Sequence, residues 1–75
     1  MLNPSVKARI REVLLTIKND PVPYKRFDVV KLKGYRNVYR IRIGSIRIVY
    51  EVDWEGRRII LHYVGSRKGA YKRAF

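Results

Sequence analysis

Three arginines in the middle of the chain have the spacing of an anion-binding site on a β-hairpin. Arg40 and Arg42 alternate with apolar residues before Gly44-Ser45, and Arg47 follows that pair. If Gly44-Ser45 is a two-residue turn with glycine at the first central position, Arg42 lies directly opposite Arg47. Two like charges that face each other across a strand pair destabilise it. The arrangement therefore favours a protein that binds a polyanion.

The apolar residues of the same stretch fix the side of the hairpin that the arginines occupy. They alternate with the basic residues on both strands and would form the buried face: Tyr39, Ile41, Ile43, Ile46, Ile48, Tyr50 and Val52. A slip of one residue would turn the arginines into the core, so the register is well specified. We refer to the opposite side, with Arg40, Arg42 and Arg47, as the arginine face.

A third strand, 58–64, brings a residue that can transfer protons to this face. The turn signal Asp53-Trp-Glu-Gly56 precedes it, and a turn centred on Glu55-Gly56 gives the pairs Val52–Ile59, Tyr50–Leu61 and Ile48–Tyr63. This register predicts Tyr63 in the core, and His62 on the arginine face beside Val49 and one strand away from Arg40. Histidine is the side chain that most readily gains or loses a proton near neutral pH. An ordinary histidine on the sheet surface is the alternative explanation.

The elements that position these residues form one small α+β domain. Residues 3–19 have the pattern of an amphipathic helix, with Asn3 as the N-cap and Pro4 at the first helical position. A connector, 20–36, with a short extended piece around Asp28–Leu32, leads to an antiparallel sheet at 37–64 and a basic tail at 65–75. We predict this helix packed on a sheet of three strands, or four if the connector supplies one. The helix would bury the residues at helical spacing, Val6, Ile10, Val13, Leu14 and Ile17.

Composition limits the partners that such a domain can have. Its 75 residues suffice for one domain, and 18 Lys and Arg against 6 Asp and Glu give a formal net charge of +12. An acidic partner follows, with nucleic acid first, an acidic protein second and a membrane surface third; a charge-rich surface of the thermophile kind is the alternative. With no Cys and one His, neither a disulfide nor a metal site is expected. No signal peptide or membrane span is recognisable, so we expect a cytoplasmic protein.

Several segments, in order and with their spacing, resemble a known family. Leu32-Lys-Gly34, Tyr39-Arg-Ile-Arg-Ile-Gly44, Arg47-Ile-Val-Tyr50 and Val64-Gly-Ser-Arg67 through Tyr71 are similar to the RelE side of the RelE/ParE superfamily of toxins from toxin–antitoxin systems. The resemblance implies a small α+β domain with an antiparallel sheet. It also implies a ribosome-dependent endoribonuclease that cleaves mRNA in the A site, by attack of a 2′-hydroxyl on the adjacent phosphate, without metal or cofactor.

The resemblance assigns roles to particular positions. Arg40 and Arg42 stand where RelE toxins often have two lysines, Arg47 and Arg67 match family arginines, and Tyr71 matches a tyrosine that stacks on a base or assists proton transfer. Preorganised guanidinium groups would stabilise the charge of the phosphorane. Arginine stays protonated and is a poor general base, which leaves His62 and Tyr71 for proton transfer. Further basic residues are expected to bind the RNA backbone: Lys31, Lys33, Arg36, Lys68, Lys72 and Arg73.

The same resemblance predicts the partners of the chain. They are a cognate antitoxin, acidic and rich in helix, and mRNA on the ribosome, with no membrane. RelE toxins usually begin with a strand and a helix before the helix assigned to 3–19, and neither pattern is present in this sequence. We therefore expect an uncovered sheet edge and self-association or reliance on a partner. Two alternatives stay open: an inactive or ParE-like relative that acts by binding gyrase or nucleic acid, and an unrelated nucleic-acid-binding module.

Overall fold

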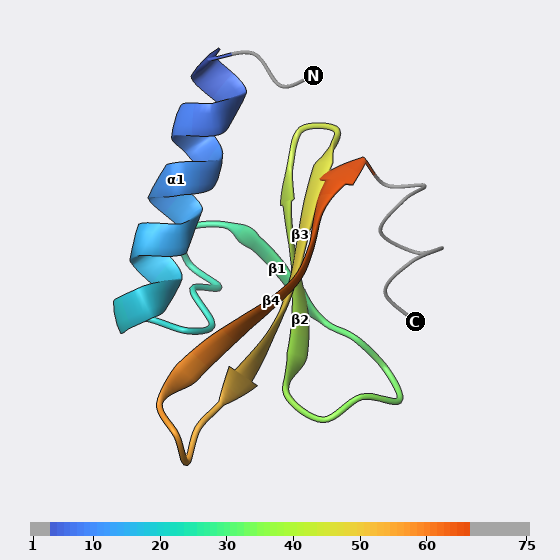
Figure 1. Cartoon of the computed structure of the whole chain (residues 1–75). Helices are drawn as coiled ribbons and strands as arrows, with labels where there is room; N and C mark the ends of the chain where they lie inside the picture. The colour runs from blue at the N-terminus through green and yellow to red at the C-terminus, as the bar shows by residue number, and fades with distance from the viewer. Residues whose placement is uncertain (1–3, 67–75) are drawn as a thin grey trace.

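One helix lies against a four-stranded antiparallel sheet (Figure 1). The structure, a computed structural model, describes residues 4–66. The elements in chain order are α1 (Pro4–Asn19), β1 (Asp28–Lys31), β2 (Val38–Ile43), β3 (Ile46–Asp53) and β4 (Arg58–Ser66), and the strands lie in the order β1-β2-β3-β4. The predicted α+β class is confirmed, and the connector supplies the fourth strand. Within residues 4–66, no helix is both long and apolar enough to cross a bilayer.

Helix α1 ends where the sequence requires it to end. Pro21 and Pro23 follow Asn19, and residues before a proline are biased away from helical geometry. The helix buries Val13 and Ile17 against the sheet, with Ile10 partly buried beside them. Leu14, which we expected in the core, is 36% exposed. It lies at the flank of the apolar stripe, over a shallow hollow that it shares with Leu61 of β4.

Strand β3 is the centre of the molecule, because it is covered on both faces. Its residues 46–50 are all buried. On the side of α1, Ile48, Tyr50 and Val52 of β3 belong to the main core. The buried residues that complete this core are Val13, Ile17, Val29, Tyr39, Ile41 and Ile43. On the arginine face, Val49 and Val38 form a second, smaller cluster with Leu32 and Tyr63. Position 47 therefore places a guanidinium group in the interior of the sheet.

Tyr50 ties the exit of the helix to the sheet. It is fully buried, and its hydroxyl donates a hydrogen bond of 2.6 Å to the carbonyl oxygen of Pro21. Its ring stacks on Tyr39 of β2, with 5.9 Å between the ring centroids. Burial, together with nearby Tyr39, Tyr24 and Asp20, raises the pKa of Tyr50 far above its ordinary value. The phenol therefore stays protonated and acts as a donor that fixes the connector.

The β2–β3 hairpin has the predicted register. Gly44 has a φ of 58°, the left-handed conformation that glycine adopts without a steric cost. Arg42 lies opposite Arg47 and Ile43 opposite Ile46. The alternation of apolar and basic residues thus predicted both faces of this hairpin correctly.

The β3–β4 pairing follows the prediction only in its first half. Val52 pairs with Ile59 and Tyr50 with Leu61, as expected, but a β-bulge then shifts the register. Beyond the bulge, Val49 pairs with Tyr63 and Ile48 with Val64. Because side chains alternate between faces, the one extra residue moves Tyr63 from the core to the arginine face and brings Val64 into the core. The predicted pairing of Ile48 with Tyr63 is wrong.

Strand β4 pairs on one side only in the described part of the chain. Ile60 and Leu61 are 36% and 47% exposed on this strand. An edge strand offers unpaired backbone groups to another chain. Self-association through this edge stays a prediction.

Replacing Tyr50 with phenylalanine removes the bond to Pro21 and leaves a carbonyl oxygen without its donor. We expect Tyr50→Phe to lower the free energy of unfolding by about 1 to 2 kcal/mol, measured by urea denaturation. Tyr24→Phe is the matched control, because Tyr24 is 61% exposed. Equal stability of the two variants would contradict the role given to the Tyr50 hydroxyl.

The carboxylate of Asp53 closes the β3–β4 turn. It accepts hydrogen bonds from the Gly56 N–H at 3.0 Å and from Nε and Nη2 of Arg58 at 3.1 and 2.8 Å. The bond from Gly56, followed by the bond from Arg58, holds the pKa of Asp53 below its usual range. A carboxylate whose folded-state pKa is depressed stabilises the fold above the unfolded-state pKa, and this contribution disappears as the pH falls through the folded-state value.

Asp53→Asn should therefore lower the melting temperature at neutral pH. The difference in melting temperature between this variant and the unmodified chain should become smaller as the pH is lowered below the usual carboxyl range, because the carboxyl group of Asp53 is then neutral as well. Thermal unfolding followed by circular dichroism over a pH series measures this difference, with the exposed Glu55→Gln as the control. A difference that is independent of pH would show that the charge of Asp53 has no part in the turn.

Candidate functional site

A carboxylate from β1 stands between the two arginines of β2. Asp28 lies opposite Arg42 in the β1–β2 register, on the arginine face. One of its oxygens is 2.8 Å from Nε of Arg42, and the other is 3.5 Å from Nη2 of Arg40. The Arg40 side chain is only 15% exposed, whereas Arg42 is 53% exposed. The two guanidinium groups thus converge on one anion, which is a group of this chain.

Arg47 is directed elsewhere although it lies opposite Arg42. The residue is 7% exposed, and its Nη1 donates hydrogen bonds of 3.0 Å to the Gly44 carbonyl oxygen and 3.3 Å to that of Ile46. It therefore binds the backbone of its own turn. The opposed arginines therefore have partners within the chain: Asp28 supplies a counter-charge, and the turn supplies hydrogen-bond acceptors. Our inference from the sequence that they require a polyanion did not include these partners.

Two donors on this face have no acceptor in the described part of the chain. They are the Nε–H groups of Arg40 and Arg47, and both are shielded from solvent. A buried donor without a partner costs free energy that a bound acceptor would recover. The arginine face thus contains two guanidinium groups whose hydrogen-bonding capacity is incompletely used.

His62 lies at the β-bulge and is paired with a carboxylate. The register passes from Leu61 to Tyr63, so His62 is the extra residue of β4. Its Nε2 is 3.0 Å from Oε1 of Glu51 on β3. The expected place beside Val49 is wrong, because Tyr63 occupies it. The histidine and the arginines therefore have different carboxylate partners, Glu51 and Asp28.

Tyr63 is a residue of the arginine face that the sequence interpretation missed. Its hydroxyl donates a hydrogen bond of 3.2 Å to the Ser66 carbonyl oxygen, and its ring covers Gly65, which lies opposite Arg47. A Cβ atom at position 65 would stand 2.5 Å from the Tyr63 hydroxyl oxygen, so a side chain there would displace the ring. A glycine inside a strand is a known sign of a bulge or a close approach. That sign was present in the sequence as Gly65.

The structure separates three other predicted residues from this cluster. Lys31 lies opposite Tyr39, on the helix side of the sheet and not on the arginine face. Lys33 and Arg36 are exposed in the β1–β2 loop, at the far end of β2 from Arg42. Six residues of strand span roughly 20 Å. The remaining predicted residues, Arg67, Lys68, Tyr71, Lys72 and Arg73, lie outside the described residues.

Chemically, the described cluster suits an anion better than a metal ion. Among residues 4–66 there is no group of three His, Cys, Asp or Glu side chains that could hold a metal. Guanidinium groups at Arg40 and Arg42 can bind phosphate through several hydrogen bonds at once. The hydroxyl of Tyr63 and the imidazole of His62 are the nearby groups that can exchange a proton.

Comparison with known proteins places the chain in a family. The chain matches, over residues 3–71, the family described as the ParE toxin of the type II toxin–antitoxin system parDE. It is 44% identical over 71 residues to the protein RelE1 of Methanocaldococcus jannaschii, covering 95% of this chain and 79% of the relative. It is 37% identical over 67 residues to toxin RelE3 of the same organism, covering 88% and 74%.

A solved structure has the same fold. The crystal structure of a RelB–RelE antitoxin–toxin complex from Methanococcus jannaschii superposes with a TM-score of 0.74 and 34% sequence identity, covering 93% of this chain and 80% of that one. The fold and the sequence matches thus agree on the class of protein. The chain belongs to the RelE/ParE superfamily and is a toxin of the type II toxin–antitoxin class.

Removing the Asp28 carboxylate should release both arginines of β2 for an external anion. We expect Asp28→Asn to bind a short single-stranded RNA roughly two- to five-fold more tightly, the range for one exposed ion pair. Fluorescence anisotropy of labelled RNA measures this affinity. Asp20→Asn changes the net charge equally but lies at the end of α1, and it is the matched control. An equal gain in RNA affinity in both variants would show that the effect comes from net charge alone.

Proposed function

We propose that this toxin is a ribosome-dependent endoribonuclease of the cytoplasm that cleaves mRNA in the A site. The observation that carries the proposal is the convergence of Arg40 and Arg42 on the single carboxylate of Asp28. A carboxylate is a planar oxyanion and a phosphodiester is a tetrahedral one, and a guanidinium group can bind either through two hydrogen bonds. Asp28 therefore occupies the place that we assign to the scissile phosphate.

In this proposal the 2′-hydroxyl attacks the adjacent phosphorus and the 5′-oxygen of the next nucleotide leaves. Arg40 and Arg42 stabilise the added negative charge of the phosphorane, as preorganised donors do. Arg47 positions the hairpin turn through its bonds to Gly44 and Ile46. Arg67 and Tyr71, which lie outside the described residues, would complete the site by family position.

Proton transfer is assigned to groups other than arginine. A guanidinium group remains protonated and cannot act as the base for the 2′-hydroxyl. Tyr63 on the arginine face and His62 beside Glu51 are the described candidates, and Tyr71 is the candidate from the tail. Positive charge around the phosphate also lowers the cost of removing the hydroxyl proton, which reduces the demand on the base.

We further propose a cognate antitoxin, acidic and rich in helix, as the regulatory partner. The RelE chain of the similar structure is bound to RelB, and this chain carries a net charge of +12. The exposed apolar side chains of Leu14 and Leu61, which line one hollow between α1 and β4, offer surface for an amphipathic helix. Such a partner would cover surface that is apolar as well as basic.

A second candidate function is inhibition by binding, without cleavage. Two observations favour it: the matching family is described as ParE, and Arg47, a residue with a proposed family role, is buried against its own turn. A toxin of this kind would bind its target through the exposed part of the same face. Cleavage distinguishes the two candidates, whereas affinity for nucleic acid does not.

The test is to incubate the purified chain with translating ribosomes and to map the ends of the mRNA. We expect cuts within the A-site codon that leave a 2′,3′-cyclic phosphate. Arg42→Ala should lower the cleavage rate by about 100-fold or more, as the loss of one donor to a transition-state oxyanion does. Arg42 is the suitable position because its side chain is half exposed, so that truncation leaves the core intact.

Lys25→Ala is the control, because it removes one exposed positive charge from the connector. Full activity of this variant would exclude a general effect of charge. Ribosome binding without cuts by the unmodified chain would reject the endoribonuclease and leave the binding candidate. An Arg42→Ala variant as active as Lys25→Ala would remove the arginine pair from the reaction.

A further inference from the structure

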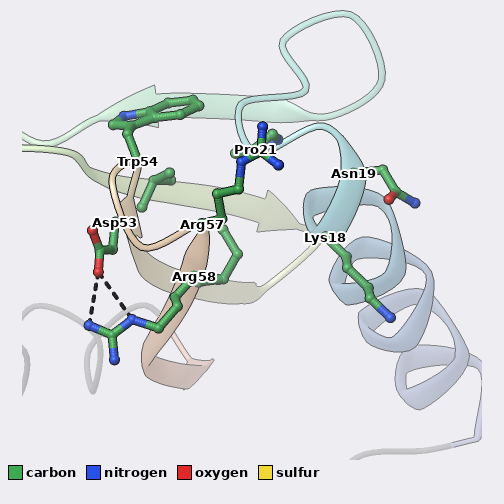
Figure 2. A pocket seen from close by; sticks show the side chains of 9 residues that line it. Lys18, Asn19, Pro21, Asp53, Trp54, Arg57 and Arg58 are labelled. Atoms are coloured by element: carbon green, nitrogen blue, oxygen red, sulfur yellow. Dashed lines mark hydrogen bonds and ion pairs between the residues drawn. The ribbon is translucent and has the colours of Figure 1, made fainter.

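A basic hollow lies at the opposite end of the sheet from the Gly44-Ser45 turn. It has a volume of about 510 Å³, within the usual range for small-ligand sites. Figure 2 shows the segments that form it: the last turn of α1 with Lys18 and Asn19, the start of the connector at Pro21, and the β3–β4 turn. Nothing in the proposed cleavage reaction uses these residues.

The positive charge of this hollow is only partly balanced. Asp53 is bound by Arg58 through two hydrogen bonds (Figure 2). Lys18 and Arg57 also line the hollow, and no ion pair within residues 4–66 includes either of them. Neither cation thus has a carboxylate of its own, and Figure 2 shows the guanidinium of Arg57 directed toward Pro21 and the ammonium of Lys18 directed away from it.

Arg57 occupies its position at a conformational cost. Its φ is 54°, in the left-handed region that glycine and asparagine adopt most easily. A turn under selection for stability alone would favour one of those residues at this position. Strained residues of this kind accumulate at ligand sites, where the side chain has a use that offsets the strain. This observation is independent of the hollow and of its charge.

Trp54 provides a flat aromatic surface in the same hollow. It lines the hollow and is 52% exposed, and it is the single tryptophan of the chain. Proteins that bind single-stranded nucleic acid combine positive charge with aromatic rings on which bases stack. An acidic peptide would satisfy the cations but would bring no flat ring to the exposed face of Trp54.

We propose that this hollow binds one nucleotide of single-stranded RNA, with its base on Trp54 and its phosphate on Arg57. The proposal rests on the proposed function in taking RNA as the substrate class. Along β3, Arg47 and Asp53 are six residues apart, roughly 20 Å. The hollow is therefore a separate contact that holds the RNA at a distance from the arginine face and lies outside the site of cleavage.

The fluorescence of Trp54 tests this directly, because the chain has no other tryptophan. Titration with a short single-stranded RNA, without ribosomes, should quench the emission in a saturable manner, and the affinity should fall as salt is raised. Inorganic phosphate alone should leave the emission unchanged, since it has no base to stack. Oligoglutamate of the same charge is the acidic-peptide probe and should not quench.

Variants then separate binding from folding. Arg57→Asn removes the charge but suits the left-handed conformation, so it should fold as well as the unmodified chain and bind RNA roughly five-fold more weakly. Lys7→Asn, which likewise replaces one exposed cation with asparagine but in the first half of α1, is the matched control and should bind normally. Trp54→Ala should weaken binding of labelled RNA by roughly five-fold or more, measured by anisotropy.

Three results would overturn the proposal: no quenching by RNA, equal quenching by oligoglutamate, or equal effects of Arg57→Asn and Lys7→Asn. Failure here is distinguishable from failure of the endoribonuclease. Arg42→Ala should lower the cleavage rate by about 100-fold or more and leave the Trp54 quenching in place. Quenching without A-site cuts would support the nucleotide site and reject the endoribonuclease reaction. Cuts without quenching would support the reaction and reject the nucleotide site.

Discussion

The burial of β3 on both faces is the constraint on which the rest of the structure depends. A strand in this position needs apolar residues on each side, and Ile48 and Val49 meet that need on opposite faces. Tyr50 fills the centre and uses its hydroxyl to anchor Pro21, so the same strand orients the helix. Arg47 is the exception that the strand must accommodate, and its hydrogen bonds to the adjacent turn satisfy part of a guanidinium group that is shielded from water.

The parts of the fold that were predictable from the sequence are those set by local pattern. The alternation around Gly44-Ser45 is sufficient to place Arg42 opposite Arg47, because turn type and side-chain period together determine register. Two features were not predictable in this way. The β-bulge that turns Tyr63 to the arginine face depends on packing across β3 and β4. The contact of Asp28 with the arginines depends on the pairing of β1, which the sequence indicated only as a short extended piece without a register.

The choice of arginine at positions 40 and 42 also has a physical explanation. A lysine that is largely shielded from water tends to lose its proton, whereas a guanidinium group remains charged. Arg40 is in that situation, with its side chain 15% exposed. Arginine further presents several donors in one plane, so that two such residues can share one anion. Arginine at position 40 thus keeps a fixed positive charge where the charge of a lysine would depend on its surroundings. In return, this residue cannot act as a base.

The position of Asp28 on β1 links the charge of the arginine face to the local stability of an edge strand. β1 has four residues, pairs with β2 alone and buries only Val29. Segments with few buried contacts open most often, in fluctuations that leave the rest of the fold intact. Each opening of β1 withdraws the counter-ion from Arg40 and Arg42 together. The electrostatic potential of the surface therefore varies with a fluctuation of the backbone, and hydrogen exchange at Val30, the residue of β1 that lies opposite Arg40 at a hydrogen-bonded position, would report the same event that exposes the arginine pair.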